Sequence, residues 1–275
     1  MEKKELLKQI QDICKQHAWS TQKNYSCSTW KADLLVSYES YKVAFNLAKC
    51  PKNVEETYKE MRKERVCGCW LILPSKYGKV EYGHLPYFQL IEENNNISVG
   101  LYKDGIDNNF DKVTLNEFIP LLITGRVRYL SELYAKYVEV CFYKRECPYC
   151  HNMSDVYFAY KVISEDGIEA ESGFDSFNPQ LIDGVKEYIK THPEEKLILG
   201  EIKSRFSKTI GESYESFGCP YCDCIFGQHY LNDEYYSLIY EIKKLQKARI
   251  KLKNAVKAYV SQWYIKKDNK SDGIS

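Results

Sequence analysis

The sequence predicts an α/β (α+β) fold in which helices flank a mixed β-sheet, followed by a cysteine-rich region and a long C-terminal helix. Three observations lead to this prediction. Residues 4–73 alternate between helical and strand-like patterns, the motif Cys-Pro-Tyr-Cys occurs twice, and residues 233–267 carry apolar side chains at helical spacing. These patterns divide the chain into four regions: 1–76, 77–140, 141–232 and 233–268.

The first region, 1–76, is predicted to be an α/β domain. A helix over 4–17 is indicated by apolar residues at helical spacing: Leu6, Leu7, Ile10, Ile13 and Cys14. Three short strand-like runs follow, at 24–27, 31–38 and 41–47. A helix over 54–65 then precedes 67–73, an apolar run typical of a strand buried on both faces. The order α-β-β-β-α-β predicts a mixed sheet with helices packed against it.

The second region, 77–140, is predicted to be a smaller α+β unit. It contains a strand-like run at 97–102 and a helix that begins at a capping box of Thr114 and Glu117. Gly125 is a plausible end for that helix, because glycine is favoured just past a helix C-terminus.

Two pairs of cysteines have the spacing of a metal site: Cys147 with Cys150, and Cys219 with Cys222. A two-residue spacer lets both thiolates of a pair reach one ion, and two pairs complete a tetrahedral shell. Region 141–232 is therefore predicted to be a zinc ribbon that holds a structural Zn²⁺. Such a closed shell leaves no open coordination position, so the ion would stabilise the fold and perform no chemistry.

Redox chemistry is the alternative for these motifs, because Cys-Pro-Tyr-Cys is also the active-site sequence of glutaredoxins. That chemistry requires a helix directly after the motif to lower the pKa of the first thiol. A strand-like run at 155–163 follows the first motif instead, which favours zinc over a redox pair or a disulfide. Cys224 and His151 are candidate substitute ligands, whereas Cys67 and Cys69 lie in a buried strand and are interpreted as core residues.

Charge is unevenly distributed along the chain. Residues 1–75 hold 13 basic and 9 acidic side chains, residues 76–242 hold 16 and 27, and residues 243–267 hold 9 basic and no acidic ones. The region 233–268 is thus predicted to be a basic helix whose candidate nucleic-acid-binding residues are Lys243, Lys247, Arg249, Lys251, Lys253 and Lys257. A docking helix with a solvated lysine face, or contact with an acidic protein partner, would produce the same pattern.

Several classes of protein are disfavoured by the sequence. No apolar run reaches the roughly 18 residues needed to cross a bilayer, and the charged N-terminus lacks the apolar region of a signal peptide. The eleven cysteines are odd in number and mostly scattered, which favours a reducing, cytoplasmic compartment. With no P-loop and no Gly-rich dinucleotide motif, no nucleotide cofactor is expected.

Residues 27–73 combine four short motifs in a characteristic order: a strand 30–36 containing Lys-Ala-Asp, a strand 43–47, a helix, and Trp-Leu-Ile-Leu at 70–73. In that order they resemble the nuclease-like domain of the competence-protein CoiA family, a branch of the PD-(D/E)xK nuclease fold. Three later segments also look like longer members of the family: 84–90, 115–126 and 146–150.

The resemblance implies an active site in which carboxylates hold Mg²⁺ and a Lys or Gln positions the attacking water. Asp33 matches the first carboxylate of the family motif. Ala44 stands where the family has Glu, and Asn46 where it has Gln or Lys, so the second motif is degenerate. One carboxylate holds a hard divalent cation poorly. Glu5, on the first helix, could contribute a second oxygen ligand to this site.

The resemblance therefore implies a catalytically inactive nuclease-like protein that binds DNA or a protein partner in DNA uptake, recombination or defence. Two alternatives stay open. One is an active Mg²⁺-dependent endonuclease with relocated ligands, and the other is a protein-interaction module or inhibitor that does not bind nucleic acid. The oligomeric state is not indicated by the sequence.

Overall fold

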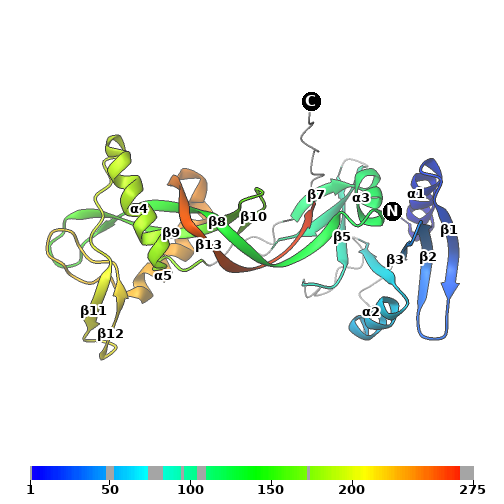
Figure 1. Ribbon diagram of the computed structural model, residues 1–275, viewed down its shortest axis with the longest axis horizontal. Coiled ribbons are helices and arrows are strands. Elements are labelled where there is room, and N and C mark those ends of the chain that lie inside the picture. The colour runs from blue at the N-terminus through cyan, green and yellow to red at the C-terminus, as the bar shows by residue number, and fades with distance from the viewer. Residues whose placement is uncertain are drawn as a thin grey trace. The chain divides into compact units, whose positions relative to one another are not determined.

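The computed structural model in Figure 1 describes residues 2–47, 53–73, 83–93, 96–103, 110–171 and 174–266. The chain is a mixed α/β protein that forms two compact units. Unit 1 comprises Met1–Ser131 and Ser261–Ser275, and unit 2 comprises Glu132–Val260. No helix in the described part of the chain has the length and apolar character needed to cross a membrane.

Unit 1 is built on one mixed sheet with the strands in sequence order. Its strands are β1 (Ser20–Ser26), β2 (Lys31–Tyr38), β3 (Tyr41–Leu47), β4 (Val66–Ile72), β5 (Tyr87–Glu93), β6 (Asn96–Tyr102) and β7 (Phe110–Thr114). Its helices are α1 (Lys3–Gln16), α2 (Val54–Lys63) and α3 (Leu115–Ile123). The β3–β4 and β4–β5 pairs are parallel, and the other neighbouring pairs are antiparallel. The order α-β-β-β-α-β that the sequence predicts for its first region is confirmed.

The sheet continues across the boundary that the sequence predicts after residue 76. Strand β4 pairs in parallel with β3 on one side and with β5 on the other, so regions 1–76 and 77–131 share one sheet. The reason lies in the apolar run of β4, because a strand buried on both faces needs a neighbour along each edge. The predicted capping box is confirmed: Thr114 Oγ1 accepts from the Glu117 N–H at 3.3 Å, and the Glu117 carboxylate accepts from the Thr114 N–H.

Two hydrophobic clusters cover the two faces of this sheet. Helices α1 and α3 pack on one face through residues such as Leu6 and Phe118, against Phe45 of β3. Helix α2 packs on the other face, where its Met61 joins Ala44 of β3 in the second cluster. Consecutive residues of β3 thus serve different clusters, which follows from the alternation of side chains along a strand.

Unit 2 contains a four-stranded antiparallel sheet in the order β10-β9-β8-β13 and a separate two-stranded ribbon. The strands are β8 (Val127–Glu146), β9 (Met153–Ser164), β10 (Glu169–Glu171), β11 (Lys203–Ser207), β12 (Glu212–Ser216) and β13 (Gln246–Ile265). Two α-helices and two short 3-10 helices accompany them: α4 (Pro179–Thr191), η2 (Pro193–Glu195), α5 (Gln228–Leu238) and η3 (Ile239–Lys244). Strand β8 begins in unit 1 and ends in unit 2, whereas β13 begins in unit 2 and ends in unit 1 (Figure 1).

The long C-terminal helix predicted over residues 233–267 is wrong. Most of that segment is β13, preceded by the end of α5 and by η3. Residues 247–253 read Lys-Ala-Arg-Ile-Lys-Leu-Lys, in which Ala248, Ile250 and Leu252 are buried and the basic residues are exposed. This strict alternation is the period of a strand. Lysine, alanine and leucine favour a helix by propensity, but pairing with β8 and burial of alternate residues outweigh that preference.

Candidate metal centre and basic strand face

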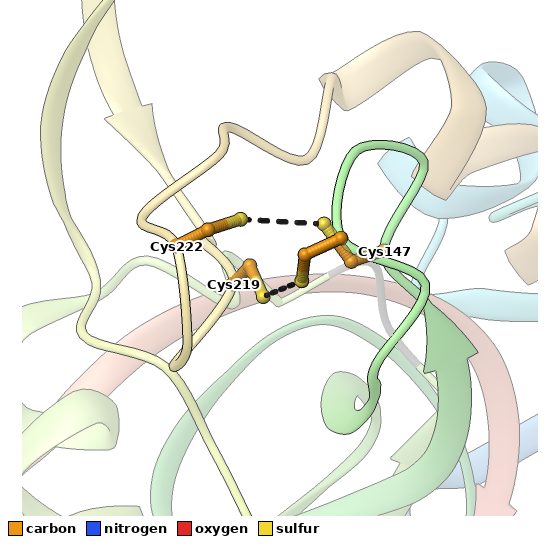
Figure 2. A group of neighbouring side chains, drawn as sticks. Cys147, Cys219 and Cys222 are labelled. Atoms are coloured by element: carbon orange, nitrogen blue, oxygen red, sulfur yellow. Dashed lines mark hydrogen bonds between the residues drawn. The ribbon is translucent and has the colours of Figure 1, made fainter.

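The structure brings the four predicted cysteines together in unit 2. All four Sγ atoms lie within 4.8 Å of one another, and the Cys147–Cys222 and Cys150–Cys219 distances are both 3.6 Å. Figure 2 shows Cys147, Cys219 and Cys222 turned toward a common centre from two loops. Four thiolates about 2.3 Å from one tetrahedral ion stand about 3.8 Å apart. The cluster therefore has the size of a four-coordinate metal shell, whereas 3.6 Å is far too long for a disulfide.

The first cysteine pair is held by a turn with two backbone hydrogen bonds. The Cys147 N–H donates to the Asn152 carbonyl at 3.0 Å, and the His151 N–H donates back to the Cys147 carbonyl at 3.0 Å. His151 has a φ of 59°, a left-handed conformation that closes the turn. The Asn152 side-chain amide also donates to the Cys150 thiol at 3.4 Å.

The second pair has the same turn. The Cys219 N–H donates to the Cys224 carbonyl at 2.9 Å, the Asp223 N–H donates to the Cys219 carbonyl at 2.9 Å, and Asp223 has a φ of 58°. The repeated Cys-Pro-Tyr-Cys sequence thus folds twice into one geometry that directs two thiols the same way. Two matching turns that face each other can enclose one metal ion between their four thiols.

A buried arginine anchors the second turn. The Arg205 guanidinium donates to the Asp223 carboxylate at 2.6 Å, to the Ser216 carbonyl at 2.7 Å and to the Glu201 carbonyl at 2.9 Å. Only 9 % of Arg205 is exposed, and its bond to the Ser216 carbonyl is buried, whereas the Asp223 carboxylate is partly exposed to water. Together they tie the turn to the β11–β12 ribbon.

Two glycines allow the backbone to pass close to this anchor. A Cβ at Gly218 would overlap the Arg205 guanidinium, and a Cβ at Gly200 would overlap the Gly218 carbonyl oxygen. Neither glycine, nor Arg205, is identified by sequence reasoning. Their role depends on contacts between segments that only the folded chain brings together.

The thiols of the cluster differ in acidity. The backbone N–H and side-chain amide of Asn152 lower the pKa of Cys150 to about 6. The backbone N–H of Cys224 lowers the pKa of Cys222, but burial and the neighbouring thiols outweigh it and raise that pKa to about 12. Four thiols this close cannot all ionise by themselves, because their negative charges repel one another. A divalent cation at the centre removes that penalty, which is the chemistry expected of a metal shell.

The geometry supports neither a redox role for the two motifs nor substitute ligands in their place. Neither motif opens a helix, since β9 begins at Met153 after the first and α5 begins at Gln228 after the second. Neither predicted substitute ligand belongs to the four-thiol group: His151 contacts Glu146 at 2.9 Å, and the Cys224 thiol, which lies close to Cys147, donates to the Ile225 carbonyl. Within the described ranges, the four cysteines are the one group of three or more potential ligands close enough to share an ion.

The residues matched to the nuclease motif form a packed, hydrogen-bonded region. Asp33 accepts the Leu47 N–H at 2.7 Å and forms an ion pair with Lys3 of α1 at 2.8 Å. Ala44 is fully buried in the cluster on the α2 side of the sheet. The buried side-chain nitrogen of Asn46 has no hydrogen-bond partner among the described residues. The Asp33 carboxylate is thus occupied by groups that hold β3 and α1 in place.

Five of the six predicted basic residues share one face of β13. These five residues all stand at odd-numbered positions of the strand, and the buried residues between 248 and 252 face α4, where Gly184 lies against Ile250. We call the five exposed residues the basic strand face: Lys247, Arg249, Lys251, Lys253 and Lys257. The sixth, Lys243, lies in η3. A helix would have distributed these charges around its axis, so only the strand gathers them on one side.

Three carboxylates contact two residues of the basic strand face. Arg249 contacts Glu139 at 3.0 Å and Glu169 at 3.5 Å, and Lys257 contacts Glu132 at 2.6 Å. The hydrogen bonds from Tyr160 and Arg249 outweigh burial and lower the pKa of Glu139, which keeps it ionised. Among the described residues, no carboxylate lies within ion-pair distance of Lys247, Lys251 or Lys253. Lys251 and Lys253 in the middle of the face, and Lys247 at its start, thus carry unneutralised positive charge.

Compared with protein-family models, with curated proteins and with solved structures, the chain matches none of them.

Proposed function

We propose that this protein is a zinc-stabilised, catalytically inactive nuclease-like protein that binds nucleic acid through the basic strand face. The observation that carries the proposal is the alignment of five basic side chains on one exposed face of β13. Nucleic acid presents a regular line of negative charges, and a row of cations along one strand complements it.

The dimensions of the face support contact with a phosphate backbone. Alternate residues of a strand stand about 7 Å apart, so the row from Lys247 to Lys257 extends over about 34 Å. A row of that length can contact several phosphates of either a single strand or a duplex. Lysine and arginine at such positions contact phosphates without reading sequence, so the binding would be sequence-independent.

Zinc is the metal that the thiol cluster suits best. A shell of four cysteine thiolates in tetrahedral arrangement is typical of structural zinc or of iron–sulfur sites, and paired Cys-x-x-Cys turns are typical of zinc ribbons. The four cysteines would hold the ion, and the ion would join the β8–β9 turn to the segment after β12. In this proposal the metal supports the unit that carries the basic strand face.

Absence of nuclease activity is expected from the packing around Asp33. We expect no Mg²⁺- or Mn²⁺-dependent cleavage of duplex DNA, single-stranded DNA or RNA, because Ala44 and Asn46 lack the second metal ligand and the water-positioning group. Asp33, the remaining carboxylate, is also paired with Lys3 and the Leu47 N–H. Gel-based cleavage assays with all three substrates measure this. Robust cleavage that Asp33→Ala abolishes would contradict the proposal and favour an active enzyme with relocated ligands.

The binding proposal is tested by charge-neutralising substitutions. Deletion of residues 243–275 is unsuitable, because β13 supplies Ile250 and Leu252 to the core of unit 2 and Trp263 to that of unit 1. The double variant Lys251→Gln/Lys253→Gln removes two charges that have no carboxylate partner. We expect it to reduce the log–log salt dependence of binding by about two, since each phosphate contact contributes about one.

The control is Lys186→Gln/Lys190→Gln on α4, an equal charge change on the helix that covers the other side of β13. With three to five phosphate contacts, the wild-type affinity is expected to fall about 40- to 500-fold between 50 and 200 mM salt. Fluorescence anisotropy with a labelled oligonucleotide measures both the affinity and its dependence on salt concentration. No affinity for single-stranded or duplex nucleic acid at 50 mM salt would overturn the proposal and leave an acidic protein as the partner.

A further inference from the structure

Two large aromatic side chains stand beside the basic strand face. Tyr259 follows Lys257 by two residues on β13 and is 77 % exposed. Tyr134 lies on the neighbouring strand β8 and is 57 % exposed. Both residues lie within strands and not in loops, so the sheet backbone presents their rings to solvent.

Lys257 links the two tyrosines to the row of charges. Its Nζ lies 5.2 Å from the centre of the Tyr259 ring and forms the ion pair with Glu132 at 2.6 Å. The Glu132 hydrogen bond, together with the phenols of Tyr259 and Tyr134, raises the pKa of Lys257. The charged ammonium thus lies beside the Tyr259 ring and within electrostatic reach of Tyr134, which joins the two tyrosines to the row of cations.

Protection of a sheet edge explains part of this surface. Strand β13 is an edge strand, and lysines on an edge discourage pairing with other chains. That role does not require tyrosines, and an exposed aromatic ring on an edge works against it. The combination of a basic row with exposed rings instead matches surfaces that hold single-stranded nucleic acid, where bases stack on the rings and lysines follow the backbone.

We infer that the nucleic acid bound at the basic strand face is single-stranded, with Tyr134 and Tyr259 stacking on its bases. The inference rests on the proposed function and specifies its ligand. In a duplex the bases stack on one another, so the two rings have no partner there. A single strand, whether DNA or RNA, offers both the unstacked bases and the phosphates that the surface complements.

The test compares oligo(dT) and oligo(rU) of 12 nucleotides with a 12-base-pair duplex by fluorescence anisotropy at 50 and 200 mM salt. The variants are Tyr134→Ala and Tyr259→Ala, with Tyr134→Phe and Tyr259→Phe as ring-retaining counterparts. Phe206→Ala is the control, because Phe206 is an exposed aromatic residue of unit 2 on the β11–β12 ribbon. Thermal melts verify that each variant is folded.

Single strands are expected to bind more tightly than the duplex. Each Tyr→Ala change is expected to weaken single-strand binding by about 5- to 100-fold without changing the salt dependence, since base–ring stacking carries no net charge. The Phe variants and the Phe206→Ala control should stay within about twofold of wild type. The tighter of oligo(dT) and oligo(rU) identifies the kind of strand.

Equal or tighter duplex binding that is unaffected by Tyr→Ala would overturn the single-strand inference and leave the proposed function standing. Failure of all three probes to bind at 50 mM salt would overturn both.

Discussion

Replacement of Cys219 by serine is expected to release the metal and to unfold the cysteine-bearing part of unit 2. Cys219 is buried and supplies one of four thiols that converge within 4.8 Å. Structural zinc sites in small peptides contribute an apparent binding free energy of about 10–16 kcal/mol. A domain is typically stable by only about 5–15 kcal/mol. Loss of even part of the metal-binding free energy would therefore remove much of the stability of this part of unit 2.

Metal analysis of the purified protein should find about one zinc per chain in wild type and almost none in Cys219→Ser. Circular dichroism should show a much lower melting temperature for the variant and for wild type treated with a strong chelator. The matched control is Cys224→Ser, which changes a thiol in the same turn that donates to the Ile225 carbonyl. Full zinc content and a wild-type melting temperature in Cys219→Ser would refute the metal site.

Replacement of Trp263 by alanine is expected to lower the free energy of unfolding of unit 1 by about 3–5 kcal/mol. Trp263 is 7 % exposed and packs against two aromatic rings. The distance between ring centres is 4.9 Å to Phe88 and 5.6 Å to Tyr129. Its indole N–H donates to the Gly83 carbonyl at 3.1 Å. The substitution removes this buried volume and leaves the carbonyl without its donor, so both effects destabilise the unit.

Urea denaturation followed by circular dichroism measures the change. Tyr259→Ala serves as the control, because it removes an exposed aromatic ring from the same strand and should cost less than about 0.5 kcal/mol. The loss in free energy of unfolding for Trp263→Phe should lie between those of Trp263→Ala and Tyr259→Ala, since phenylalanine keeps part of the ring contact. A Trp263→Ala midpoint equal to that of wild type would show that the end of β13 does not belong to the core of unit 1.

The sequence by itself determined those features that depend on a few neighbouring residues. The spacing of the two Cys-Pro-Tyr-Cys motifs identifies the four cysteines that the structure brings together, because two-residue spacing constrains where both thiols of a turn can point. The order α-β-β-β-α-β and the capping box of Thr114 and Glu117 are equally local. Each was predicted correctly for that reason.

Features that join distant segments were decided only by the tertiary structure. Arg205 and the close approach of Gly200 to Gly218 support the second cysteine turn through contacts that no single stretch of sequence reveals. Asp33 likewise acquires its partner Lys3 only when α1 packs on the sheet.

Strand β13 is the clearest case in which the sequence alone does not determine the structure. Its lysines, alanines and leucines favour a helix in isolation, and its apolar residues satisfy a helical stripe as well as a strand alternation. Pairing with β8 and packing of Ile250 beneath α4 select the strand, because they bury alternate residues and satisfy the backbone. That selection places five cations on one face, and with them the surface on which the proposed function rests.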